Sequence, residues 1–314
     1  MLPKISVIIP THNDAEFLRE SIPSVLEHGR DIPLEILVID DGSEPSAESF
    51  YNPRDPRVTF HYQKAKGVSA ARNRGMHLAV GEYIVFLDAD DHMLPERLTR
   101  QLRVLDENPE VGLVGGDITR RSQTGLEESW GIFEAFGAEI PNHELGDDCY
   151  IFEEKFRDLL LFHYPFNTSV MTVRRQAVGK EIQFDPELIC WEDWDFVVRI
   201  ARKWKIGYVK RPVCMYRKRP GSITTTADPR KFLSRAAMFG KWLDDFKQLT
   251  PEQRRHLEKQ ENDAWLAASY EFRATDRLCA LKCASHALRQ MPRWKAFRSM
   301  LGSMISPASA RAMF

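Results

Sequence analysis

The stretch EYIVFLDADDHMLP, residues 82–95, joins a run of strand-forming apolar residues to three carboxylates, Asp88, Asp90 and Asp91. Ligands of open α/β sheets bind outside the carboxyl ends of the strands. If the chain stays extended through Ala89, Asp88 and Asp90 point to the same side, because side chains alternate along a strand. Two such carboxylates suit a hard divalent cation, which takes oxygen ligands and would offset their mutual repulsion.

The segments around this stretch predict a mostly parallel sheet flanked by helices. Alternation of short apolar runs with helical patterns is typical of an α/β fold. After Asp117 the alternation breaks, and up to Tyr164 we expect loops, a hairpin and one helix. The predicted strands are 5–10, 34–40, 58–63, 83–87, 111–116, 169–173, 206–209 and 213–218, and the predicted helices are 16–28, 68–80, from about Pro95, 152–164 and 191–204.

From about residue 228 onward every signal is helical. Helices are predicted at 230–246, 251–273 and 276–291, with no strand pattern among them. We therefore expect residues 1–227 to form one α/β domain, and residues 228–314 to form an all-helical appendage packed on its sheet.

Composition indicates an ordinary globular protein. The 314 residues are 43% hydrophobic and 28% charged, with a net charge of -1, so no global field attracts nucleic acid and we expect no such partner. The five scattered cysteines are expected to be free thiols, as in a reducing compartment. The beginning of the chain does not resemble a signal peptide, and no apolar run reaches the ~18 residues of a membrane span. We expect a cytoplasmic protein, or one peripheral on the cytosolic face of the inner membrane.

A second acidic cluster follows another predicted strand. LVIDDGS places Asp40 and Asp41 at a strand end, where an isolated Asp-Asp-Gly sequence would be read as a turn. Two acidic clusters on neighbouring strand ends of one sheet favour a binding site instead.

Five motifs together resemble family 2 glycosyltransferases, which have the GT-A fold, a Rossmann-like α/β sheet. ISVIIPTHND, LEILVIDDGS, GVSAARNRG, GEYIVFLDADD and WEDWDFVVR occur in the order and spacing of that family, over residues 4–220. The resemblance implies a nucleotide-sugar half over about 1–117 and an acceptor half over about 118–227.

By this resemblance the nucleotide base lies against Pro10, Thr11 and His12, the last in place of a frequent tyrosine. Asp41 would hydrogen-bond the base, usually uracil, which implies a UDP-sugar as the donor.

The resemblance also implies which residues hold the rest of the donor. Arg72 and Asn73 would lie near the nucleotide and its phosphates. Asp88 would contact the ribose region, and Asp90, with Asp88 beside it, would hold Mn²⁺ or Mg²⁺ against the diphosphate. A cation there stabilises the charge that develops on the leaving group.

The acceptor side is expected at WEDWDF. The family's Glu-Asp pair corresponds to Glu192 and Asp193, and we favour Asp193 as general base of an inverting displacement, with Glu192 as its alternate or as an acceptor-binding residue. Trp191 and Trp194 flank the pair and could offer apolar faces to a sugar. Asp195 has a simpler explanation, an ion pair with Arg199 at i, i+4.

Two basic segments remain open to more than one interpretation. Arg217, with Lys218 and Arg219, could reach the diphosphate or could be a solvated loop. The helix over 292–305 could lie on an anionic membrane surface or could pack on the helical appendage. The match of Gln290–Trp294 to a signature of processive synthases is treated as a coincidence.

These patterns predict a metal-assisted glycosyltransferase that moves a sugar from a nucleotide diphosphate to a saccharide or lipid-linked saccharide, in cell-surface polysaccharide assembly. A non-catalytic relative that binds sugar nucleotides or glycans is the alternative. A sugar-nucleotide nucleotidyltransferase is less favoured, because no Gly-rich basic loop follows the first strand.

Overall fold

The computed structural model describes residues 3–122, 125–136, 140–219 and 228–290, together with Ser299. These residues form two compact units, one comprising residues 1–186 with 192–222 and the other comprising residues 187–191 with 223–314. Each unit is described separately below.

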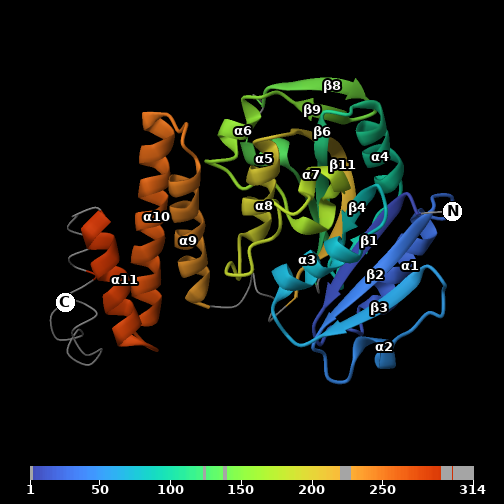
Figure 1. Ribbon diagram of the computed structural model, residues 1–314, viewed down its shortest axis with the longest axis horizontal. Coiled ribbons are helices and arrows are strands. Elements are labelled where there is room, and N and C mark those ends of the chain that lie inside the picture. Colours follow the sequence, from blue (N-terminus) through green and yellow to red (C-terminus); the bar gives the residue numbers. More distant parts are fainter. Residues whose placement is uncertain (1–2, 123–124, 137–139, 220–227, 291–298, 300–314) are drawn as a thin grey trace. The chain divides into compact units, whose positions relative to one another are not determined.

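The first unit is built on one mixed sheet flanked by helices (Figure 1). The strands are β1 (Ile5–Thr11), β2 (Leu34–Asp41), β3 (Val58–Gln63), β4 (Tyr83–Phe86), β5 (His92–Met93), β6 (Val111–Ser122), β7 (Gly125–Trp130), β8 (Asn142–Gly146), β9 (Cys149–Phe152), β10 (Thr172–Arg174) and β11 (Lys205–Arg217). The helices are α1 (Leu18–His28), α2 (Ala47–Phe50), α3 (Val68–Leu78), α4 (Arg97–Glu107), α5 (Ile132–Phe136), α6 (Phe156–Leu159), α7 (Arg175–Val178) and α8 (Glu192–Ala201), with a 3₁₀ turn at Thr168–Val170.

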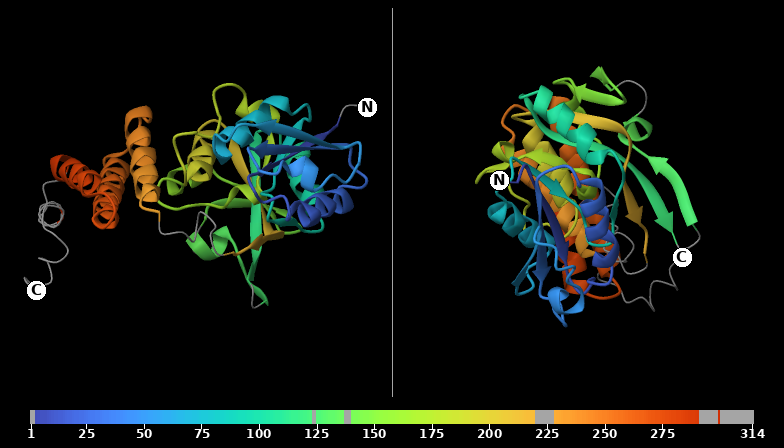
Figure 2. Two further views of the ribbon diagram at one scale, coloured as in Figure 1. Left: turned by 90° about the horizontal axis from the view of Figure 1, so that it is seen from below. Right: turned by 90° about the vertical axis from the view of Figure 1, so that its right-hand side faces the viewer.

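The order of the strands confirms the mostly parallel sheet. It runs β3-β2-β1-β4-β10-β6-β11-β9-β8, with β5 paired to β11 and β7 paired to β6. Strands β1 to β4 are parallel, and β10 runs antiparallel to both β4 and β6, so β6 and its parallel neighbour β11 point the same way as β1. Figure 2 shows the β6–β7 hairpin extending beyond the rest of this unit.

Helices cover both faces of the sheet, as expected from the buried strands. On one face, Gly75 of α3 lies directly on Ile8, and the ring of Phe196 from α8 meets Phe86 of β4 edge-on. On the other face, Tyr83 of β4 donates a hydrogen bond to Asp106 of α4. Burial on both faces explains why the strands read as continuous apolar runs.

Two predictions about local structure were wrong, and the condition set for the Asp88–Asp90 stretch is not met. The helix expected over 152–164 is reduced to the four residues of α6, and two hairpins precede it instead of one. The strands expected at 206–209 and 213–218 are one strand, β11, whose register shifts around Pro212, which has no N–H to donate to the ladder. The chain does not stay extended through Ala89, because the Asp91 N–H bonds the Asp88 carbonyl at 3.1 Å and closes a turn.

Apart from Glu187–Trp191, the described part of the second unit is mainly helical and contains α9 (Arg230–Asp245), α10 (Pro251–Phe272) and α11 (Arg277–Gln290), with α10 between the other two (Figure 1). The bounds agree with the prediction to within one residue. Thr250 and Gln253 form a capping box at the start of α10, with Pro251 in the first turn. The buried Asn262 side chain donates to the Ala287 carbonyl and ties α10 to α11.

Candidate active site at the carboxyl edge of the sheet

The carboxyl ends of β1, β2 and β4 meet at one edge of the sheet. Thr11 pairs in register with Asp40, and Ile8 with Phe86, so the residues that follow these strands are neighbours. Ser169 fixes the end of β4 by accepting the N–H of Asp88 at 3.0 Å. The two acidic clusters predicted to lie together are therefore at the same edge.

Two guanidinium groups offset the repulsion among the three carboxylates of the Asp88–Asp91 turn. Burial acts in addition, because it raises the pKa of Asp90 and of Asp91 and so favours their neutral forms. Arg72 donates to Asp88 at 2.7 Å, and Arg219 donates to Asp90 at 2.7 Å. Burial, with the nearby charge of Asp88, raises the pKa of Asp90 against the opposing effect of Arg219. Burial also raises the pKa of Asp91 well above its ordinary value, so this carboxyl favours its neutral form.

Arg72 joins the strand edge to helix α8. Its side chain is 4% exposed and donates to Asp88 and to Glu192, each at 2.7 Å. The Phe184 ring lies 5.3 Å from its guanidinium carbon. Burial acts to lower the pKa of Arg72, but the charges of Asp88 and Glu192 raise it above its ordinary value. The family resemblance implied that Arg72 lies near the phosphates of the donor. In the structure Arg72 is a charged bridge between Asp88, in the predicted nucleotide-sugar half, and Glu192, in the predicted acceptor half.

Asp193 follows Glu192 in the first turn of α8 and is hydrogen-bonded on both oxygens. Its Oδ2 accepts from the Tyr164 hydroxyl at 2.6 Å, and its Oδ1 accepts from the Trp194 N–H at 2.8 Å. Burial, and then the charge of Glu192, raise the pKa of Asp193 to about 7, against the opposing effects of Tyr164 and Arg72. A carboxylate with a pKa near neutrality is well matched to general base catalysis.

The raised pKa of Asp193 predicts a pH-dependent stability change. The folded state disfavours the charged carboxylate, so Asp193 contributes no destabilisation below pH 3.8, increasing destabilisation as the pH rises, and its full effect above about pH 7. Asp193→Asn is expected to raise the melting temperature at pH 8, with the gain shrinking toward pH 4. Thermal denaturation at both pH values checks this, and an equal change at both would show that the charge of Asp193 is not the cause.

Of the two tryptophans beside this pair, Trp194 does not offer a face to a ligand, and for Trp191, which is partly exposed, the expectation stays a prediction. Trp194 is 4% exposed, and its Nε1 donates to the Leu160 carbonyl at 2.7 Å. Trp191 precedes α8, with φ of 71°. The predicted ion pair of Asp195 with Arg199 is confirmed at 2.5 Å.

Basic side chains at the end of β11 contact the acidic turn. Arg219 bridges Asp90 and Asp14, and its guanidinium carbon lies 5.0 Å from the Phe17 ring. Arg217 bonds Glu20 at 2.5 Å, and its backbone N–H donates to Asp91. The sequence left open whether this segment was a solvated loop, and the two arginines are in fact held in ion pairs at the site.

The residues expected at the nucleotide base lie together at the ends of β1 and β2. Pro10 and Thr11 are buried, and the Thr11 hydroxyl has no hydrogen-bond partner among the described residues. His12 bonds the Asp41 carbonyl through Nδ1 at 2.7 Å, which makes Nδ1 the protonated nitrogen. The Asp41 carboxylate is occupied by the Gln63 amide and by the N–H groups of Lys66 and Gly67.

The side chain of Asn73 binds the backbone of Phe184. Its Nδ2 donates to the Phe184 carbonyl at 2.7 Å, and its Oδ1 accepts the Phe184 N–H at 2.8 Å. This pair of bonds fixes the segment whose ring covers Arg72. The structure therefore brings Asn73 to the support of the site and does not direct its amide toward the carboxylates.

The acidic turn offers a partial site for a divalent cation. Asp88 and Asp90 each have one carboxylate oxygen without a hydrogen bond to any described residue. In the described part of the chain, no group of three or more His, Cys, Asp or Glu side chains is arranged to hold a metal. Two carboxylates fit a cation such as Mg²⁺ that takes its remaining ligands from phosphates and water.

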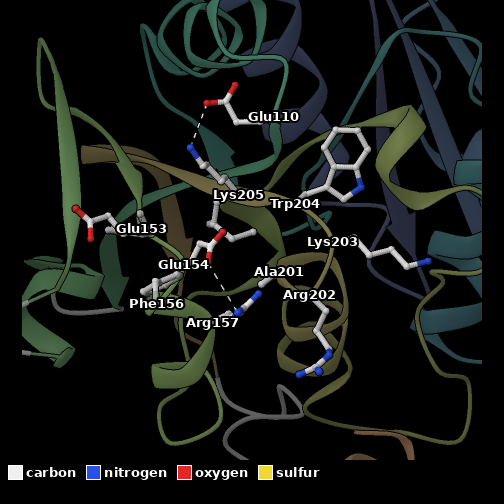
Figure 3. Close-up of a pocket in the computed structure, with 12 residues that line it drawn as sticks. Glu110, Glu153, Glu154, Phe156, Arg157, Ala201, Arg202, Lys203, Trp204 and Lys205 are labelled. Atoms are coloured by element: carbon white, nitrogen blue, oxygen red, sulfur yellow. Dashed lines mark hydrogen bonds and ion pairs between the residues drawn. The ribbon is translucent and has the colours of Figure 1, made fainter. Parts of the chain in front are cut away.

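A pocket lies at the other edge of the sheet and is separate from this site (Figure 3). It is lined by Trp204 and Lys205, where β11 begins, and by Glu110, just before β6. The Lys205 ammonium and the Glu110 carboxylate are 3.3 Å apart. Because β6 and β11 run parallel to β1, their beginnings lie opposite the carboxyl edge that holds the acids.

Some predictions fall outside the described residues. These are most of the Gln290–Trp294 match, almost all of the 292–305 helix, and the part of the basic segment after Arg219. Within the described chain, no helix is both long and apolar enough to span a membrane. Cys279 is partly exposed, and Cys283 is buried.

Comparison with solved structures identifies the fold. S. aureus TarS 1–349 in complex with UDP-GlcNAc matches 96% of this chain and 89% of that chain, with a TM-score of 0.64 and 17% identity. The mannosyltransferase PcManGT from Pyrobaculum calidifontis, in complex with GDP-Man and Mn²⁺, matches 97% and 85%, with a TM-score of 0.57 and 18% identity. At these identities the likeness concerns the fold, which is the GT-A fold.

Sequence comparison places the chain in a family. The model of glycosyl transferase family 2 matches residues 6–182, and the chain belongs to this family. An uncharacterized glycosyltransferase of Methanocaldococcus jannaschii is 28% identical over 221 residues, which are 68% of this chain and 71% of that protein. The chain spans only 18% of the length of some other curated relatives.

Proposed function

We propose that this glycosyltransferase is a metal-assisted, inverting enzyme that moves a sugar from a nucleotide diphosphate to an acceptor hydroxyl. The observation that carries the proposal is the buried Arg72 bridge. It holds Asp88, beside the proposed donor site, and Glu192, next to the proposed base, on one guanidinium. Donor and acceptor groups are thereby brought to one place, which direct transfer between two bound substrates requires.

Asp193 is the proposed general base, and Glu192 is not. The Glu192 side chain is 11% exposed, and its Oε1 is bonded to Arg72. Arg72 already binds Glu192 at 2.7 Å, so this carboxylate serves the bridge to Asp88. Asp193 is partly exposed, and its pKa is about 7, so it can take a proton near neutral pH.

The proposed reaction is a single displacement. Asp193 accepts the proton of the acceptor hydroxyl while that oxygen attacks the anomeric carbon of the donor sugar. The bond from this carbon to the diphosphate oxygen breaks, and the electron pair leaves with the nucleoside diphosphate. A cation held by Asp90 and Asp88 would supply electrostatic stabilisation of the leaving diphosphate. The chain itself contributes the guanidinium of Arg219, which already lies at Asp90.

The donor we propose first is a UDP-sugar. Support comes from the UDP-GlcNAc complex of TarS, while the GDP-Man complex of the Pyrobaculum mannosyltransferase makes a GDP-sugar the second choice. The proposed acceptor is a saccharide or lipid-linked saccharide, in polysaccharide assembly on the cytoplasmic side of a membrane. The acceptor proposal rests on membership of glycosyl transferase family 2.

A thermal-shift screen tests the donor site. A ligand that binds only the folded protein raises its melting temperature. With UDP, GDP, dTDP and CMP, each with and without Mn²⁺, we expect one nucleoside diphosphate to stabilise the protein in a Mn²⁺-dependent way. Asp90→Asn should abolish that dependence, whereas Asp106→Asn, on the opposite face of the sheet, should keep it. No shift with any nucleotide would contradict a donor site and favour a non-catalytic glycan-binding protein.

A further inference from the structure

We propose that Tyr164 is a positioning residue that holds the Asp193 carboxylate in the orientation needed to receive the acceptor proton. This inference rests on the proposed function, because it gives Asp193 the role of general base. The Tyr164 hydroxyl donates to Asp193 Oδ2 at 2.6 Å. Nothing in the motifs around Glu192 and Asp193 points to this tyrosine, which comes from the irregular segment between α6 and the 3₁₀ turn.

Both ends of the hydrogen bond are fixed by packing. The Tyr164 ring meets the Trp194 ring edge-on, with centroids 6.0 Å apart at 81°. The indole N–H of Trp194 donates to the Leu160 carbonyl and anchors the ring. The backbone N–H of Trp194 donates to the other oxygen of Asp193. The carboxylate is therefore restrained at Oδ1 by its own helix and at Oδ2 by Tyr164. Each oxygen keeps a second lone pair that can accept a proton.

The charged and titratable groups around this pair determine the sign of its effect. Glu192 repels the Asp193 carboxylate, and Arg72 attracts it. Tyr164 faces Asp193, Glu192 and Tyr216 of β11. Burial, followed by the Asp193 charge, raises the pKa of Tyr164 well above its ordinary value, so the hydroxyl remains a donor at neutral pH. A donor to the ionised carboxylate favours that form, so removing the hydroxyl should make Asp193 more basic.

The test is the pH profile of kcat for Tyr164→Phe. We expect kcat to fall about tenfold or more, and the acidic limb to move up by about one pH unit, with the KM for the donor unchanged. Tyr83→Phe is the matched control, because Tyr83 also donates to an aspartate, Asp106 of α4, but on the other face of the sheet. That variant should leave the profile in place.

A second variant covers the possibility that Tyr164→Phe does not fold. Replacing Tyr164 by 3-fluorotyrosine keeps the ring and makes the hydroxyl a stronger donor, so the acidic limb should move to lower pH. An unmoved profile in the variants that fold, together with an inactive Asp193→Asn, would overturn the role of Tyr164 and leave the proposed function standing. An active Asp193→Asn would instead overturn the proposed function itself.

Discussion

Asp193→Asn is expected to lower kcat by about 10²- to 10⁴-fold while leaving nucleotide affinity unchanged, because general base catalysis contributes about that much to a rate. Asparagine keeps the size of the side chain, and its Oδ1 can still accept the Trp194 backbone N–H while its Nδ2 donates to the Tyr164 oxygen, so the fold of α8 should persist. What the variant loses is the ability to take the acceptor proton. Steady-state kinetics gives the first quantity, and calorimetric titration with the stabilising nucleotide gives the second.

The matched control for this variant is Asp195→Asn, two residues further along the same helix. Asp195 pairs with Arg199 at i, i+4, whereas Tyr164 bonds Asp193 and Arg72 bonds Glu192. We expect kcat to stay within a few-fold of the unmodified protein. Equal losses of kcat in the two variants would show that α8 is sensitive to any change of charge, and would contradict the assignment of the base to Asp193.

Arg72→Met is expected to destabilise the first unit by about 3–5 kcal/mol, toward the lower end because the Asp88 side chain is one-third exposed. The substitution leaves Asp88 and Glu192 without their common cation, and an unpaired buried carboxylate is costly. Urea denaturation followed by tryptophan fluorescence measures the loss. Adding Glu192→Gln to Arg72→Met should recover part of the lost stability, because Glu192 is the more buried of the two carboxylates that lose their cation.

Arg74→Met provides the control for this change, because Arg74 lies two residues away in α3 and its side chain makes an exposed hydrogen bond to the Tyr62 carbonyl. A surface substitution of this kind changes stability by about 0.5 kcal/mol or less. If Arg72→Met proved as mild as Arg74→Met, the bridge would not hold the site together, and the observation behind the proposed function would lose its force.

The three described helices of the second unit could be predicted almost completely, because their signals are local. The start of α10, for example, is set by a capping box and a first-turn proline that the sequence displays directly, at Thr250 and Pro251. The failed helix over 152–164 shows the opposite case. Phe152 and Phe156 recur at helical spacing, yet Phe152 ends β9 and Phe156 begins the short α6, with their ring centroids 4.0 Å apart and tilted by 32°. Periodicity of apolar residues alone cannot distinguish these two arrangements.

The candidate site was predictable in position but not in its internal pairing. Strand ends and carboxylates located the acidic edge, including Asp88 and Asp90. The partners of these acids come from distant parts of the chain, since Arg72 and Glu192 are 120 residues apart. Tyr164 had no sequence signal beyond an aromatic residue in an irregular region. Charge pairing across such separations follows only from the folded topology.

The most direct test of the central claim is the configuration of the sugar that is released from a donor. Nucleotide sugars labelled with ¹³C at the anomeric carbon are mixed with excess protein and Mn²⁺, with water as the acceptor, so that cleavage outpaces mutarotation. We predict that NMR first detects the inverted anomer, and that Asp193→Asn releases none. Release of the retained anomer, or no cleavage of a donor whose nucleotide binds, would contradict an inverting displacement with Asp193 as its base.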